Sequence, residues 1–297
     1  MRWIDNSFVA PSLALLWTLG LGYGGCGGAE EAAPKPATPE PATAGPAAAP
    51  SAEPEAEPAK SRADLVEGKN AANPDRLPRV TITAPGNEQR IAAHYAQDYK
   101  VRYRVQNWQA MPEGSYLQFV LDGVPYEPVP DPKRPVELRA LAGGKDIAEG
   151  EHVLAAYVAR KNHESIKADG AVSVRRFWIG KKSESTWDSS QDALLVLGRP
   201  HGTYEGDEVD EILVDYYVIN ALLAADDHSI RFKLTGPGID PSGITKIISE
   251  WRPLLVWSPS DGEHQLEAEL LDAKGQPVAN PWNPAKLTFT VRRNAAK

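Results

Sequence analysis

The stretch SYLQFVLDG at residues 115–123 recurs as HSIRFKLTG at residues 228–236. Three further blocks recur in the same order and at nearly the same spacing: VRYRVQN (101–107) as VDYYVIN (214–220), EGEHVLAAYV (149–158) as DGEHQLEAEL (261–270), and VRRFWIG (174–180) as KLTFTVR (286–292). A period of about 110 residues is too long for a solenoid and matches a whole domain. The sequence therefore predicts two copies of one domain.

Each block reads as a strand. Leu117, Phe119 and Leu121 alternate with Gln118 and Val120, and the second copy alternates apolar with charged residues, as expected for a strand with one buried and one wet face. Turn residues separate the blocks, and no stretch of helical length after residue 78 carries a clear helical stripe. The segment 207–224 comes closest, but its core matches a strand of the first copy. About seven short strands per copy predict an antiparallel β-sandwich.

Two motifs carry a family resemblance. The run DGEHQLEA at 261–268, continuing to DAKGQ at 272–276, resembles the late hairpin of bacterial immunoglobulin-like domains. EGEHVLAA at 149–156 opens the first copy in the same way, and TITAPGN at 81–87 is similar to the first strand of such modules. The resemblance implies an all-β protein with tandem Ig-like sandwiches at 79–180 and 192–293. It also implies binding or spacing units that are generally not enzymes.

The chain's one cysteine, Cys26, follows an apolar run at residues 8–22 and two small residues, Gly24 and Gly25. This arrangement resembles a bacterial lipoprotein signal, with residues 1–25 removed and Cys26 lipidated. An ordinary signal peptide that leaves a free thiol is the alternative. An uncleaved anchor is a third reading, against which the shortness of the run argues.

Residues 26–78 are predicted to be a linker. From 29 to 60 the chain is almost entirely Ala, Pro, Glu and Thr, a composition that cannot bury apolar area and favours disordered, semi-extended polyproline II. Segment 61–78 is polar and rich in turn residues, and is expected to continue the approach to the folded body. Such a tether would hold that body clear of a membrane.

The formal net charge is −8, and no basic cluster with interleaved aromatic residues is visible along the sequence. Nucleic acid is therefore not expected as a partner. A mildly acidic body suits the cell envelope, at the periplasmic face of an outer membrane or at the cell surface.

Catalytic and metal signals are weak. His152 and His264 occupy equivalent places in the two copies, which favours a structural role over metal binding. Ser165 lies close to His163 in sequence, but a solvated loop explains the pair, and neither a nucleophile elbow nor zinc spacing is present. We expect no enzyme, cofactor or metal. A calcium site in the acidic run 205–211 is the exception considered, and a solvated loop explains that run equally well. Its candidate ligands are Glu205, Asp207 and Asp210.

Three tryptophans bear on the organisation. Trp178 is predicted to lie in a sandwich core, and Trp187 to cover the joint between the domains. Trp282 lies in a loop rich in Pro and Asn, where it could anchor the loop or stack on a sugar ring.

The favoured function is a tethered envelope protein that binds a protein or polysaccharide through loops 160–170 and 272–284. Loops at the end of an Ig-like sandwich commonly carry recognition. The candidate binding residues are Arg160, Lys161, His163, Glu164, Lys167, Lys274, Gln276 and Trp282. The alternative is a structural spacer or assembly subunit that uses edge-strand pairing. An envelope enzyme is the third class.

Overall fold

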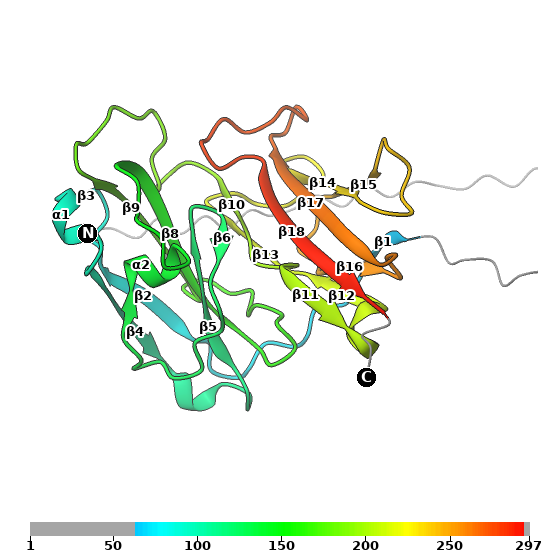
Figure 1. Cartoon of the computed structure of the whole chain (residues 1–297), viewed down its shortest axis with the longest axis horizontal. Helices are drawn as coiled ribbons and strands as arrows, with labels where there is room; N and C mark the ends of the chain where they lie inside the picture. Colours follow the sequence, from blue (N-terminus) through cyan, green and yellow to red (C-terminus); the bar gives the residue numbers. More distant parts are fainter. Residues whose placement is uncertain (1–62, 294–297) are drawn as a thin grey trace, which may run out of the picture. The chain divides into compact units, whose positions relative to one another are not determined.

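The computed structural model describes residues 63–293 (Figure 1), so the predicted signal, Cys26 and the tether up to residue 62 lie outside the described residues. The described residues belong to one compact unit. Strands dominate. The α-helices α1 (Ala93–Ala96) and α2 (Leu138–Leu141) and the 3-10 helices η1 (Trp108–Ala110) and η2 (Gly206–Val209) are each about one turn long. Within 63–293, no helix has the length and apolar character needed to cross a membrane.

The first sandwich pairs a three-stranded sheet with a five-stranded one. The smaller sheet has the order β2 (Arg79–Ala84), β4 (Lys100–Gln106) and β7 (Val136–Glu137). The larger has the order β3 (Gln89–Ile91), β9 (Val172–Ile179), β8 (Gly150–Ala159), β5 (Tyr116–Leu121) and β6 (Val124–Pro125). Ile82, Phe119, Leu154 and Phe177 are fully buried between the two sheets.

The second sandwich repeats this plan. Its five-stranded sheet has the order β11 (Gly202–Glu205), β18 (Ala285–Arg292), β17 (Gly262–Leu271), β14 (Ser229–Thr235) and β15 (Ile244–Ile248). Opposite it, β10 (Leu194–Leu197) pairs with β13 (Tyr216–Ile219), and β12 (Glu211–Val214) pairs with β16 (Leu254–Trp257). Asp215 separates β12 from β13.

The strand order confirms two tandem immunoglobulin-like sandwiches. In each, a short early strand runs parallel to the last strand, β3 beside β9 and β11 beside β18, whereas the remaining pairs are antiparallel. The four recurring sequence blocks fall on equivalent strands: β4 and β13, β5 and β14, β8 and β17, β9 and β18. The repeat in sequence is therefore a repeat in structure.

The two equivalent histidines have the structural role predicted for them. His152 stacks on Phe177 with ring centroids 5.4 Å apart, and His264 stacks on Phe289 at 5.3 Å. The Nε2 atom of each lies within hydrogen-bond distance of the carbonyl oxygen four residues earlier, at 2.9 and 2.8 Å. Each histidine thus ties the turn before a long strand to the sandwich core.

The predicted linker boundary at residue 78 is wrong for residues 64–67. These form β1 (Asp64–Glu67), which pairs antiparallel with β16 of the second sandwich, far away in the chain (Figure 1). Leu65 enters the core of that sandwich and is only 3 % exposed. One buried leucine in a four-residue segment is too short a pattern for sequence reasoning to assign.

The chain then crosses from the second sandwich to the first. The Asn70 side chain donates to the backbone oxygen of Trp251 at 2.6 Å, and the backbone N–H of Ala71 donates to Glu164 Oε1 at 2.9 Å. These contacts fasten the segment before β2 to both sandwiches.

A third apolar cluster, here called the junction, joins the two sandwiches. It is formed by the outer face of β5 and β8, the outer face of β10 and β13, and one tryptophan between the domains: Tyr116, Val120, Val153, Ala155, Tyr157, Ala159, Leu194, Val196, Tyr217 and Trp187. β5 and most of β8 are therefore buried on both faces, unlike strands with one wet side.

The junction uses the five-stranded sheet of the first sandwich but the β10–β13 sheet, on the opposite side, of the second. The sequence difference between the two copies explains this choice. Where the first sandwich places Val120 and Ala155 on the outer face of β5 and β8, the second has Lys233 and Glu267 on β14 and β17. Where the second places Leu194 and Val196, the first has polar side chains on β2 and β4: Thr81, Thr83, Arg102 and Arg104. The outer face of β2 and β4 is consequently not part of the junction.

The three tryptophans considered in the sequence occupy two settings. Trp187 covers the joint, as predicted, and meets Trp282 edge-on at 4.9 Å, so Trp282 anchors its loop. Trp178 is fully buried, but it lies outside the sandwich core in which Phe177 packs. Its ring lies instead beneath the cations of Arg176 and Lys182. The prediction that Trp178 lies in the sandwich core is therefore wrong: its side chain is on the opposite face of β9 from Phe177.

We predict that Leu65→Ala lowers the free energy of unfolding by about 2 kcal/mol or more, because it removes buried methyl groups from the second sandwich. Val66→Ala, at a neighbouring residue that is 39 % exposed, should cost less than about 0.5 kcal/mol. Urea unfolding of the full chain measures both. Equal, small effects would show that β1 does not contribute to the fold.

Candidate functional site: a cationic groove on the first sandwich

The predicted recognition loop 160–170 is not a free tip. Arg160, Glu164 and Ser165 are buried, with relative exposures of 8, 5 and 0 %. Of the residues predicted here, Lys161 is exposed and His163 half-buried. The expectation of a solvated loop around Ser165 is wrong, because this loop packs against the second sandwich.

A buried ion pair fixes the loop to that sandwich. The carboxylate of Asp215, 1 % exposed, accepts hydrogen bonds from the backbone N–H of Ser165 at 3.0 Å, from its hydroxyl at 2.8 Å and from Lys167 Nζ at 2.8 Å. Lys167 Nζ also lies over the rings of Tyr217 and Trp251, at 5.2 and 5.9 Å from their centroids. Burial lowers the pKa of Lys167, whereas Asp215 opposes that shift. The Lys167 ammonium group therefore makes its contacts within its own chain and is not presented to a partner.

His163 belongs to a second polar cluster across the junction. Its Nδ1 lies 2.7 Å from the Tyr116 hydroxyl and 3.1 Å from Arg199 Nη2. Because a guanidinium can only donate, Nδ1 is the unprotonated acceptor. Burial and Arg199 lower the pKa of His163 to about 4, and burial with the same arginine lowers that of His201 to about 4.

The second predicted loop, 272–284, is a separate feature. Lys274 and Gln276 are exposed at its tip, where Asp272 Oδ1 accepts their backbone N–H groups at 2.8 and 2.9 Å. Within the described part of the chain, no hydrogen bond, ion pair or ring contact joins this loop to 160–170. The two loops therefore do not form one site.

The calcium candidates do not gather either. Glu205 pairs with Arg292 at 3.5 Å and Asp210 with Arg293 at 2.5 Å, while Asp207 lies on η2. Among residues 63–293, no group of three or more His, Cys, Asp or Glu side chains is placed to hold a metal ion. The acidic run is a surface segment with arginine partners.

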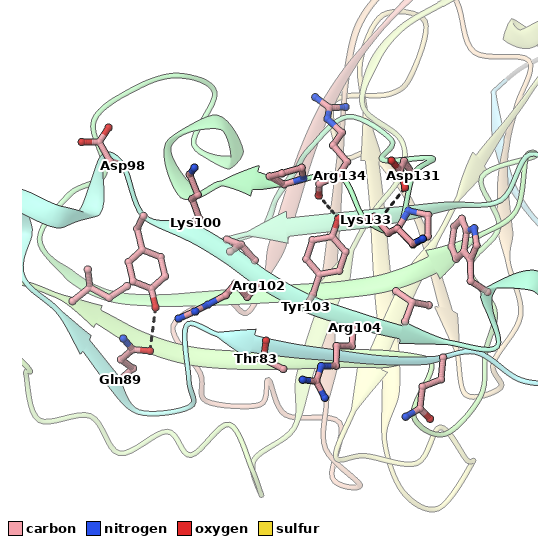
Figure 2. Close-up of a pocket in the computed structure, with 18 of the residues that line it drawn as sticks. Thr83, Gln89, Asp98, Lys100, Arg102, Tyr103, Arg104, Asp131, Lys133 and Arg134 are labelled. Atoms are coloured by element: carbon pink, nitrogen blue, oxygen red, sulfur yellow. Dashed lines mark hydrogen bonds between the residues drawn. The ribbon is translucent and has the colours of Figure 1, made fainter.

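A large hollow lies on the first sandwich, along β4 (Figure 2). Its volume is about 1380 Å³, and β4, the segment 89–99 and the loop 131–135 form its walls. We call it the cationic groove because six basic side chains line it against two acidic ones, Asp98 and Asp131. The six are Arg90, Lys100, Arg102, Arg104, Lys133 and Arg134.

Hydrogen bonds hold the walls of the groove. The Tyr103 hydroxyl donates to the backbone oxygen of Arg134 at 2.5 Å, and that of Tyr99 donates to Gln89 Oε1 at 3.2 Å (Figure 2). Burial raises the pKa of Tyr103 to about 12, with a further contribution from Asp131. Tyr103 therefore remains a neutral donor and keeps the loop 131–135 at a fixed place beside β4.

The groove's cations are exposed and available. All six are exposed, and none makes an ion pair with another residue of the described chain. In a protein of net charge −8, this is a local excess of positive charge. Such a surface attracts and orients anionic groups.

Sequence reasoning missed this site. Arg102 and Arg104 were visible as the polar positions of VRYRVQN, but Lys133 and Arg134 lie about 30 residues away in a loop without a periodic pattern. No basic cluster is contiguous in the sequence, but the fold brings these segments together around Tyr99 and Tyr103. The alternating arginines were the only available signal.

Comparisons with known proteins return structural likenesses alone. No protein-family model and no curated protein matches the sequence. Among solved structures, the chain is similar to the fibronectin(III)-like modules of Clostridium thermocellum CbhA, with 14% identity over 73% of this chain and 96% of that one and a TM-score of 0.25. It is also similar to the D00-D0 domain of intimin, with 10% identity over 71% of this chain and 96% of that one and a TM-score of 0.21. Likenesses at these levels say nothing of what this chain binds.

We predict that Asp215→Asn destabilises the fold by about 3–5 kcal/mol, because it leaves the Lys167 charge buried without its counter-ion. Glu267→Gln removes one partner of the more exposed pair between Lys286 and Glu267 and should cost less than about 1 kcal/mol. Urea unfolding monitored by tryptophan fluorescence compares the two. A loss below that of the control would contradict a stabilising role for the buried pair.

We also predict that stability falls as pH drops from about 6.5 toward 4. The folded-state pKa values of His163 and His201, about 4, lie below the ordinary value of 6.5, so the unfolded chain takes up these protons first. His152 opposes this trend, because the Asp122 carboxylate raises its pKa despite burial. Urea midpoints at pH 7 and pH 5 measure the net effect.

The double variant His163→Gln, His201→Gln should reduce that loss of stability between pH 7 and pH 5. His94→Gln, at an exposed histidine outside the junction, is the matched control and should retain it. An unchanged loss in the double variant would rule out these two histidines as its source.

Proposed function

We propose that this protein is a non-catalytic, lipid-tethered envelope protein that binds a protein or polysaccharide partner through the cationic groove of its first sandwich. The observation that carries the proposal is the groove itself: about 1380 Å³ lined by six exposed basic side chains without ion-pair partners in the described chain. A concave surface where several polar groups are gathered is a usual form of a binding site.

The junction supports this choice of surface. It occupies Lys167 and the buried part of loop 160–170, and it covers the outer faces of β5, β8, β10 and β13. The outer face of β4 and the groove beside it remain outside the junction. Lys274 and Gln276 are exposed as well, but they lie on a hairpin tip without a hollow.

The non-catalytic part of the proposal rests on how the reactive side chains are used. The Ser165 hydroxyl donates to Asp215, and His163 faces Tyr116 and Arg199, so serine and histidine have separate partners. A serine nucleophile needs an adjacent base within hydrogen-bond reach. Attachment through Cys26 and an envelope location are proposed from the sequence alone.

An architectural spacer is the second candidate. The observation that favours it is the junction, where an apolar cluster and a buried ion pair join the two sandwiches. If the protein is a spacer, changes to the side chains of the groove should not alter capture of a partner.

Charge reversal separates the two candidates. The variant Arg102→Glu, Arg104→Glu should lose capture of its envelope partner by at least about tenfold, because attraction at the groove becomes repulsion. Immobilised protein, incubated with solubilised envelope and washed at low salt, gives the measurement as recovered partner.

The matched control reverses two exposed lysines away from the groove, Lys145→Glu and Lys233→Glu, so that net charge changes equally. This control should capture partner as the unmodified protein does. Equal capture by the groove variant and the control would leave the spacer function as the better account.

A further inference from the structure

The second sandwich shows how the strand equivalent to β4 is used when it has a partner. In both sandwiches a tyrosine hydroxyl of this strand donates to an arginine carbonyl at 2.5 Å, Tyr103 to Arg134 and Tyr216 to Arg252. Lys167 Nζ from the first sandwich also donates to the backbone oxygen of Tyr216. A group from another part of the protein can therefore bind the backbone at the edge of this strand while the hydrogen bond between the tyrosine hydroxyl and the arginine carbonyl is kept.

The same edge of β4 has no partner. β7 pairs with only the first two residues of β4, and the bond from Leu138 N–H to the Tyr99 oxygen, at 2.8 Å, fixes which residues face that side. Alternation along an antiparallel strand then directs the backbone groups of Tyr103 and Val105 toward the open edge. Within residues 63–293 these groups receive no hydrogen bond across it.

A proline keeps this edge open. If β7 were extended toward the N-terminus in its register, Arg134 would face Tyr103 and Pro132 would face Val105. Proline has no N–H to donate to the ladder, so Pro132 cannot complete the pair with Val105. The backbone N–H of Arg134 turns to the oxygen of Asp131 instead, at 3.0 Å. The loop thus borders β4 without pairing with it.

Basic side chains flank this edge on both sides. Arg102 and Arg104 point to one side of β4, and Lys133 and Arg134 come from the loop on the side to which Tyr103 points (Figure 2). A strand added at the edge would project its side chains alternately to these two sides. Acidic residues at consecutive positions of such a strand would each meet a cation.

We propose that the cationic groove takes an extended acidic polypeptide segment of a partner protein, which pairs with the free edge of β4 as an added strand. This inference rests on the proposed function and names the ligand class of its site. Backbone hydrogen bonds to Tyr103 and Val105 provide affinity, and the flanking cations select acidic segments. Acidic segments rich in proline do not fit, because they lack the N–H groups that pairing needs.

The test uses the full chain and a fluorescein-labelled peptide of glutamate and threonine, about six residues long, enough to span the free edge at roughly 3.4 Å per residue. Fluorescence anisotropy should detect binding that weakens with added salt. A second peptide has every threonine replaced by proline and therefore carries the same charge. We expect it to bind at least about tenfold more weakly, because strand pairing is blocked.

Protein variants and hydrogen exchange supply the other arms. The variant Arg102→Glu, Arg104→Glu should weaken the threonine peptide by at least about tenfold, whereas Lys145→Glu, Lys233→Glu should change binding by less than about twofold. On the unmodified protein, the bound peptide should slow amide exchange at Tyr103 and Val105. This arm does not depend on any variant folding.

Three outcomes would overturn the inference: equal binding of the proline peptide, equal or tighter binding of polygalacturonate or single-stranded DNA, or unchanged exchange at the two amides. Any of these would indicate binding by charge alone or a different ligand class. If envelope capture still depends on Arg102 and Arg104 in that case, the groove remains the binding site and only the strand-pairing inference fails.

Discussion

The packing of one sheet face against another at the junction decides what the rest of the molecule can present. Val120, Val153 and Tyr157 give the first sandwich an apolar outer face, and Leu194 and Val196 give the second a matching one. Apolar surface of this extent is stabilised by removal from water, so each sandwich contributes one face to the contact. Loop 160–170 follows β8 into the same contact, where Asp215 neutralises Lys167. A buried lysine without that carboxylate would be strongly unfavourable.

The junction joins opposite faces of two similar sandwiches. The face that is covered in the second sandwich is therefore left uncovered in the first. On that face β4 carries Arg102 and Arg104, whereas the equivalent positions of the second sandwich are Asp215 and Tyr217, both buried. Duplication of one domain has thus produced two different surfaces from one set of strands. The residue at each outward position decides whether the face is internal or available to a partner.

The sequence predicted the repeated domain, the alternating strands and the shared role of His152 and His264 because each depends on local periodicity or on a comparison between copies. It placed the recognition loops at 160–170 and 272–284 by analogy with the ends of other sandwiches. The first of these is buried, because the fold brings Asp215 beside Lys167 across nearly 50 residues of chain. One clue was present: β5 reads Tyr-Leu-Gln-Phe-Val-Leu, with Val120 where the second copy has Lys233, and an apolar residue on the outer face favours a covered sheet.

The sequence by itself determined the Ig-like class, the number of domains and the acidic character of the chain, since periodicity, repetition and composition are local or summed properties. Only the tertiary structure decided that β1 completes the second sandwich and that loop 160–170 is internal. It also decided that Arg102, Arg104, Lys133 and Arg134 share one groove. These features depend on contacts between segments far apart in the chain. Such contacts form because buried apolar area and paired charges are stabilised in three dimensions, whatever the distance along the sequence.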